Sequence, residues 1–318
     1  MTTDGTAHGP GTAREIADGI FAIDTGFRGR AGAVAAFLVV GPEGLGLVET
    51  GPTTVQDNLL AGIRDAGHDI GDVRDVIVTH IHLDHAGGLG TLMRDQPQVR
   101  SWVHPVGLPH MLRPERLIAS ASRIYGDQMD VLWGPFLPLP EDRVQPTEEG
   151  TPILLAGRPI VPWDTPGHAS HHVALLDEQT GTLFTGDVAG VRMQGTSFPV
   201  PPLPPPDIDI SAWKRSIARM RGLSPERLAL THFSVFDDVG QHLDILERGL
   251  DETMAIGRDV LVPGGANDEL TARLEAWQRE GLGEDAERVA AALDAANPLY
   301  MSAQGIHRVL RKAGEIEA

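Results

Sequence analysis

The sequence predicts a layered α/β protein with two β-sheets inside and helices outside. Three observations favour this class. Short apolar runs alternate with helical patterns, a group of strands followed by a helix occurs twice, and residues 240–310 are helical in pattern almost throughout. The chain of 318 residues is long enough for one large domain with a helical appendage.

The first group of strands lies near the N-terminus. Apolar runs separated by glycine and proline predict consecutive strands over residues 20–24, 33–40 and 45–49. A helix is expected over residues 54–66, because apolar residues recur there at helical spacing, and Thr53 or Thr54 is the expected N-cap. Two further strands are expected over residues 76–79 and 99–104.

The second group follows a long insertion, residues 107–149, which is expected to form helices over the cleft of the protein. Its strands are expected over residues 159–164, 173–176 and 183–185, followed by a helix over 211–221 and a strand over 228–231. We assign residues 16–260 to one domain and residues 261–318 to a C-terminal helical extension.

Composition limits the function of the chain. The absence of cysteine excludes disulfides, thiolate zinc sites and cysteine nucleophiles, so any metal must be bound by His, Asp or Glu. A net charge of −18 would repel a nucleic acid. The longest apolar run, residues 33–40, is too short to span a bilayer, and the first residues lack the pattern of a secretory signal. We therefore expect a cytoplasmic protein with a small-molecule substrate. The sequence does not decide between a monomer and a homodimer.

The stretch VIVTHIHLDHAGGL, residues 76–89, concentrates metal-ligand side chains at the end of a predicted strand. His80 and His82 are two residues apart in extended chain, so their side chains point the same way and can share one ion. Asp84 and His85 follow where the chain should turn into a helix, which aims them at a second point. Two ions about 3.5 to 4 Å apart can activate one water between them, and the spacing favours two ions over one.

The motif THIHLDHAGG resembles the H-x-H-x-D-H motif of the metallo-β-lactamase superfamily. Three more segments resemble that family in order: DTPGHASHH, LFTGD and LALTHF. The resemblance covers about residues 16–250 and implies an αββα four-layer sandwich. It also implies a first metal site of His80, His82 and His168, a second site of Asp84, His85 and His232, and Asp187 as the carboxylate between them.

A bridging aspartate implies a particular reaction within that family. Glyoxalase II-like thioesterases and lactonases have this carboxylate, whereas true metallo-β-lactamases lack it. The resemblance therefore implies hydrolysis of a carboxylic ester, thioester or lactone by a hydroxide held between two divalent ions, with zinc expected and iron or manganese as alternatives. Asp84 is a candidate to protonate the leaving group. Tyr125 is a candidate oxyanion donor, with an ordinary packing role as its alternative.

The sequence departs from the family pattern at two places, and a further segment is unusual in composition. Glu49 in VETGP replaces the usual aspartate, so its contact to the ligands must reach one methylene further or be lost. His171 and His172 follow the third ligand, His168, and are expected behind the ligands or facing the sheet. The proline-rich residues 198–207 should be extended, either as a surface connector or as a stiff wall beside Asp187.

Two other functions remain open from the sequence. The first is an oxygenase resembling persulfide dioxygenases, with one iron held by His80, His168 and Asp187. Oxygen consumption with a glutathione persulfide and one iron per chain would favour it. The second is a metal-binding module without catalysis, which detectable turnover of any ester would exclude.

Overall fold

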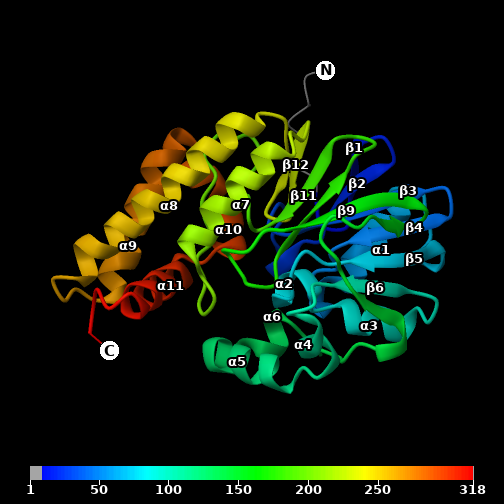
Figure 1. Cartoon of the computed structure of the whole chain (residues 1–318), viewed down its shortest axis with the longest axis horizontal. Coiled ribbons are helices and arrows are strands. Elements are labelled where there is room, and N and C mark those ends of the chain that lie inside the picture. The colour runs from blue at the N-terminus through cyan, green and yellow to red at the C-terminus, as the bar shows by residue number, and fades with distance from the viewer. Residues whose placement is uncertain (1–8, 318) are drawn as a thin grey trace.

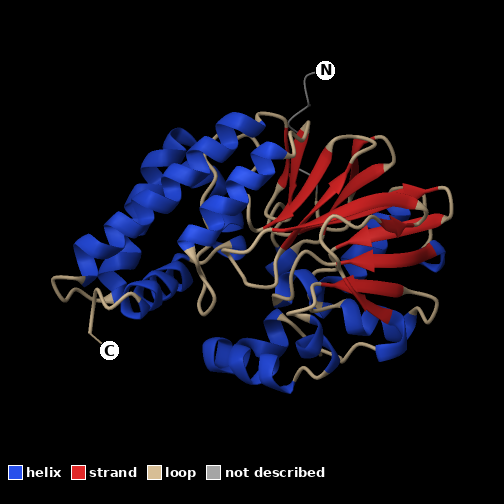
Figure 2. Ribbon diagram, viewed as in Figure 1, coloured by secondary structure: helices blue, strands red, loops and turns tan. Residues whose placement is uncertain are grey.

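A computed structural model describes residues 9–317 and contains two β-sheets between layers of helices (Figures 1 and 2). The first sheet runs in chain order, with β1 Ala13–Ala17, β2 Ile20–Asp24, β3 Ala35–Gly41, β4 Gly44–Val48, β5 Val73–Ile77, β6 Arg100–Val103 and β7 Val144–Pro146. The second has the order β13-β12-β11-β10-β9-β8, with β8 Ile153–Leu155, β9 Arg158–Asp164, β10 Val173–Asp177, β11 Thr182–Gly186, β12 Arg227–Leu230 and β13 Ser234–Phe236.

The two sheets pack face to face through a continuous apolar core. Phe37 of the first sheet meets Phe184 of the second at 5.1 Å between ring centroids, and Ile77 and Leu175 lie in the same buried cluster. The strands carry β-branched and other bulky side chains on both faces, because each sheet is covered on both sides.

Helices cover the outer faces. On the first sheet lie α1 Gln56–Asp65 and α3 Leu89–Asp95, and the short helix α2 Leu83–Ala86 directly precedes α3. On the second lie α7 Ile210–Gly222 and α8 Val239–Leu261. The predicted αββα class is therefore confirmed.

The C-terminal helices form a block beside the second sheet (Figure 1). They are α9 Asn267–Leu282, α10 Ala286–Ala296 and α11 Leu299–Lys312, and α9 and α11 pack on each other and on α8. Within residues 9–317 no helix has the length and apolarity needed to cross a membrane.

The insertion, residues 107–149, contains three α-helices, two short 3-10 helices and one strand. The α-helices are α4 Leu108–Leu112, α5 Glu115–Tyr125 and α6 Met129–Leu132. Its last part, β7, pairs in parallel with β6, so the insertion ends as an edge strand of the first sheet. Only helices were predicted here, because a three-residue edge strand leaves almost no periodic pattern in the sequence.

Other local differences concern strand ends and a helix cap. The strand expected over residues 76–79 is Val73–Ile77, since the chain leaves the first sheet there and the Thr79 carbonyl accepts from Val173 of the second. The predicted threonine N-cap is wrong. Helix α1 begins at Gln56, and the hydroxyls of Thr53 and Thr54 donate instead to carbonyls of Pro135 and Leu132, each at 2.8 Å.

Candidate metal centre

The seven predicted ligands come together at one edge of the sandwich, where strands of both sheets end. His80 and His82 follow β5, and the short helix α2 carries Asp84 and His85. The turn between β9 and β10 carries His168, while Asp187 and His232 follow the ends of β11 and β12. Their donor atoms form two neighbouring groups, one of His80, His82, His168 and Asp187 and one of Asp84, His85 and His232.

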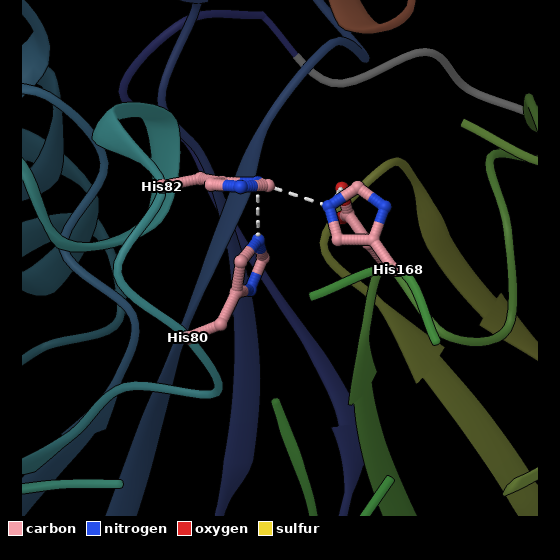
Figure 3. Close-up of side chains that lie close together, drawn as sticks. His80, His82 and His168 are labelled. Carbon is pink, nitrogen blue, oxygen red and sulfur yellow. Dashed lines mark hydrogen bonds and ion pairs between the residues drawn. The ribbon is translucent and has the colours of Figure 1, made fainter. Parts of the chain in front are cut away.

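Three imidazoles of the first group converge on one point (Figure 3). His82 Nδ1 lies 2.9 Å from His80 Nε2 and 2.9 Å from His168 Nε2. A single Nδ1 can donate a proton to only one of these two atoms. In a tetrahedral site with bonds of 2.0–2.1 Å, ligand atoms lie about 3.3 Å apart, so the arrangement has the dimensions of a metal site.

The second group shows the same spacing. His85 Nε2 lies 3.1 Å from Asp187 Oδ1, and His232 Nε2 lies 3.3 Å from Asp84 Oδ2. The two histidine nitrogens and Asp187 Oδ1 are buried without a hydrogen-bond partner within the described chain. Polar atoms that lie this close but do not align with one another point at a common centre, which is where a cation would satisfy all of them.

Asp187 lies between the two groups. Its Oδ2 faces the first, 3.2 Å from His168 Nε2, and its Oδ1 faces the second, 3.1 Å from His85 Nε2 and 3.4 Å from His232 Nε2. One carboxylate therefore presents a separate oxygen to each group, and the donor set of nitrogen and oxygen atoms fits two divalent ions.

The other ring nitrogens are fixed by hydrogen bonds. His168 Nδ1 donates to the Pro202 carbonyl at 3.0 Å, and His232 Nδ1 donates to the Ala33 carbonyl at 2.8 Å. A carbonyl can only accept, so these contacts place the proton on Nδ1 and leave the Nε2 lone pair for a metal.

Glu49 performs the same task for His85. Its Oε1 accepts from His85 Nδ1 at 3.2 Å and from the hydroxyl of Thr79. The longer side chain therefore keeps the contact that the sequence analysis left in question. The Glu49 backbone is in the left-handed region, with a φ of 67°, an uncommon conformation for a residue other than glycine.

The adjacent histidines have different surroundings. His172 is fully buried, and its Nε2 accepts from the Asp187 backbone N–H at 3.1 Å, so it supports the carboxylate from behind. His171 stacks on His80 at 6.1 Å between centroids and lines the adjoining cavity. The expected position behind the ligands is thus found for His172, whereas His171 forms part of the cavity wall.

The surroundings of the two groups shift the pKa values of their histidines in different directions. Burial, reinforced by His168, lowers the pKa of His82 to about 3, and burial also lowers the pKa of His80 and His168. These rings are neutral and have free lone pairs at neutral pH. Burial opposes protonation of His85 as well, but Asp187 and Asp84 outweigh it and raise the pKa of that ring.

The carboxylates show the complementary effect. Burial would raise the pKa of Asp84, but His85 and His232 outweigh burial and lower it to about 2. The same two histidines hold the pKa of Asp187 well below its usual range. Both carboxylates are therefore ionised at neutral pH, which favours cation binding.

A cavity opens from the metal centre, with Asp84 and Tyr125 among its lining residues. Asp84 is only partly buried, whereas His85 beside it is not exposed at all. The Tyr125 hydroxyl donates to Met301 Sδ at 3.6 Å, and burial raises the pKa of this phenol. Tyr125 therefore lies at the cavity, and its role as an oxyanion donor stays a prediction.

Several parts of the site were not predictable, or not predicted, from the sequence. The carbonyls of Ala33 and Pro202 have no sequence pattern, because every residue has a carbonyl. Pro202 belongs to the proline-rich segment, so this segment is a wall of the site rather than only a connector. Thr79, which contacts Glu49 and His80, could have been suspected from its place beside the first ligand.

Comparisons with known proteins find a family model, related sequences and similar folds. A sequence model of a protein family, the metallo-beta-lactamase superfamily, matches residues 29–232. The metallo-beta-lactamase fold-containing protein ST1585 of Sulfurisphaera tokodaii is 32% identical over 161 residues, which cover 49% of this chain and 59% of ST1585. The solved structure of ST1585 has 25% identity and a TM-score of 0.59, covering 74% of this chain and 86% of that one.

Two further similar proteins are a di-iron protein and a thioesterase. The structure of TTHA1623 in a di-iron-bound form has 27% identity and a TM-score of 0.51, covering 67% of this chain and 93% of that one. An atrochrysone carboxyl ACP thioesterase, dmxR1 of a Cryptosporiopsis species, is 24% identical over 164 residues, which cover 52% of this chain and 38% of the enzyme. The match spans less than two thirds of each of the two curated relatives, ST1585 and dmxR1.

Proposed function

Because the chain belongs to the metallo-beta-lactamase superfamily, we propose that it is a hydrolase that cleaves a carboxylic ester, thioester or lactone with two divalent ions. The observation that carries the proposal is the position of Asp187, whose two oxygens face two separate groups of donor atoms. When bound, two such ions supply Lewis-acid activation of water and of the scissile carbonyl.

The ligand side chains would hold the ions in fixed positions. His80, His82 and His168 offer three neutral nitrogens to the first ion, and Asp84, His85 and His232 surround the second. Asp187 would bind both and offset their mutual repulsion. We propose zinc as the ion, with iron or manganese as alternatives, and the di-iron form of TTHA1623 supports iron as a candidate.

Asp84 is positioned to transfer a proton between the attacking water and the leaving group. Its Oδ2 contacts His232 and His85, and its side chain is still 20% exposed beside the cavity. The other oxygen, Oδ1, can hold a proton from the attacking water and pass it to the leaving alkoxide or thiolate. The Tyr125 hydroxyl can donate to the oxygen of the carbonyl under attack, because its contact with Met301 is to a weak sulfur acceptor.

The ester and thioester class has two supports. The first is the carboxylate between the donor groups, a feature in which this chain resembles the glyoxalase II-like and lactonase branches of the family. The second is the thioesterase dmxR1 among the similar proteins. We further expect a small-molecule substrate, because a net charge of −18 disfavours nucleic acids. A cytoplasmic location remains part of this proposal.

A combined metal and activity measurement tests the proposal. Protein purified without added ions is analysed for metal and then screened, metal-replete, against thioesters, lactones and phosphoesters. The proposal expects two ions per chain and turnover of a carbonyl substrate. One iron per chain, with oxygen consumption on a glutathione persulfide, would favour the oxygenase over the hydrolase. Two bound ions with no turnover of any substrate would favour a non-catalytic metal-binding module.

A further inference from the structure

The cavity at the metal centre extends well beyond the ligands. It has a volume of about 690 Å³, within the range of cavities that bind drug-sized molecules. His82, Asp84 and Asp187 line one end of the cavity. Most of the remaining lining comes from three segments that contain no candidate metal ligand. The chemistry of these walls decides which substrates the centre accepts.

The first wall is helix α5 of the insertion. Leu117, Ala121 and Ile124 are spaced by four and three residues, so they share one helix face, and all three line the cavity. Helix α5 packs mainly on its neighbours within the insertion, and Leu117 and Ile124 stay half-buried. The apolar face of α5 therefore packs on a small buried cluster around Phe27 and Trp133, and together with that cluster it lines the cavity.

The second wall comes from the C-terminal extension, where α10 is joined to α11. Ala295 and Met301 line the cavity there, and both are buried. The hydrogen bond from Tyr125 to Met301 joins this wall to the end of α5. In Figure 1, α5 lies below the sheets and α11 lies to its left, so the walls come from two separate helical parts of the protein.

Aromatic rings and prolines form the remaining surface. The Trp133 ring stacks on Phe27 at 5.3 Å between centroids and meets the Tyr125 ring edge-on at 5.0 Å, and all three residues line the cavity. The prolines within residues 202–206 of the proline-rich segment also contribute to the lining, and the Pro202 carbonyl accepts the hydrogen bond that orients His168. Stacked rings and prolines have little freedom to lose on binding, so the cavity is preformed.

Charged side chains lie at the outer rim. Arg28, Arg116, Asp207 and Asp294 line the cavity and are all exposed, and Arg28 pairs with Asp294 at 3.5 Å. Away from this rim, the carboxylates of the lining are those of Asp84 and Asp187 at the metal end. The space between the metal end and the rim is therefore lined mainly by apolar side chains, with Ser120, Gln128 and the buried Asn297 as polar members.

We infer that this space, the apolar arm between α5 and residues 294–301, binds a large apolar group next to the scissile carbonyl, such as a medium or long alkyl chain or a fused ring system. The reaction at the carbonyl rests on the proposed function. Binding of the apolar group does not, because the arm contains no metal ligand.

A series of esters tests the selectivity. On p-nitrophenyl esters from acetate to decanoate, kcat/KM should rise about fourfold for each added methylene until the arm is filled, as expected for burial of a methylene in an apolar site. A kcat/KM that is independent of chain length, or that falls from acetate onwards, would overturn the inference.

Bulky substitutions on each wall test the location. Ser120 of α5 and Ala296 of α10 line the cavity and are not fully buried, so Ser120→Trp and Ala296→Trp should fold and narrow the arm. Ala119→Trp and Ala291→Trp are matched controls on the same helices, at exposed positions outside the lining. The decanoate-to-acetate ratio of kcat/KM should fall on the order of tenfold in the first pair and less than about twofold in the second. Equal ratios in all four variants would place the subsite elsewhere.

A binding measurement separates the arm from the reaction. Protein treated with a chelator is titrated with the neutral fluorophore N-phenyl-1-naphthylamine, and 1-decanol is then used to displace it. Displaceable binding, weakened by Ser120→Trp and Ala296→Trp but not by their controls, is expected. Such binding without turnover of any ester would keep the subsite and refute the proposed reaction, whereas its absence in the wild-type chain would refute the subsite.

Discussion

The Glu49 carboxylate accepts a hydrogen bond from His85 Nδ1 at 3.2 Å, and neither side chain is exposed. A carboxylate behind a metal-binding histidine fixes the ring and raises its basicity. Glu49→Gln keeps the shape and removes the charge. We expect it to weaken binding of the second ion by about 10- to 100-fold and to leave the first ion in place.

Titration of metal-free protein with zinc, followed by mass spectrometry, measures this effect. Glu49→Asp restores the charge one methylene shorter and should retain more of the second ion than Glu49→Gln. An unchanged affinity for both ions in Glu49→Gln would contradict an orienting role.

Asp187→Asn tests the carboxylate between the two groups. The change removes the negative charge that faces both donor sets, while three histidines remain at the first site. We expect the second ion to be lost more readily than the first and turnover to fall on the order of 10² or more. Metal content is measured beside kcat on the best ester. Full activity with two ions retained would refute the bridging role, and collapse of the fold would indicate a structural metal site.

Acid should remove the second ion before the first. Asp187 and Asp84 raise the pKa of His85, and Asp187 raises that of His232, whereas burial lowers the pKa of His82 to about 3. A proton and a metal compete for the same nitrogen, so affinity for the second ion falls with decreasing pH from a higher pH than affinity for the first. Metal content after dialysis between pH 8 and pH 5 should show two separate steps. Loss of both ions in one step would contradict this difference.

Tyr125→Phe tests the candidate oxyanion donor. Among residues 9–317 the hydroxyl has a hydrogen bond only to the sulfur of Met301, at 3.6 Å, so it can turn to a substrate oxygen at little cost. If it does so, its removal should lower kcat by about tenfold or more and leave the metal content unchanged. The other tyrosine, Tyr300, is exposed at the cavity, and Tyr300→Phe should have a smaller effect. Wild-type kcat in Tyr125→Phe would assign Tyr125 to packing.

His242 should make the folded state sensitive to acid. It is buried in α8, donates from Nε2 to the Ala189 carbonyl at 2.7 Å, and burial lowers its pKa to about 4. The unfolded chain, with a usual pKa of about 6.5, binds more protons between pH 6.5 and pH 4. Stability from this group is therefore complete above about pH 6.5 and is lost, by about 3 kcal/mol, as the pH falls to 4.

Chemical denaturation at several pH values, with chelator present, measures this contribution. His242→Gln keeps a donor and does not titrate, so its free energy of unfolding should decline less steeply with acid than that of the wild-type chain. Parallel curves for the two proteins would exclude His242 as a source of the pH dependence.

The sequence by itself determined the fold class and the identity of the candidate ligands. His80, His82, Asp84 and His85 are adjacent in the chain, so strand and helix geometry alone brings them together. Long periodic elements such as α7 and α8 were also predictable, because their packing faces repeat at short intervals. Edge strands of three residues, such as β7 and β8, were not predictable, because such short segments become strands only by pairing with a neighbouring strand.

Only the tertiary structure decided what surrounds those ligands. The carbonyl that orients His232 belongs to Ala33, 199 residues earlier, and the contact between Tyr125 and Met301 spans 176 residues. Contacts of this kind use backbone atoms common to every residue, or apolar side chains that would serve equally well in a core. Their partners are chosen by the packing of whole layers against one another, and no local pattern in the sequence records that choice.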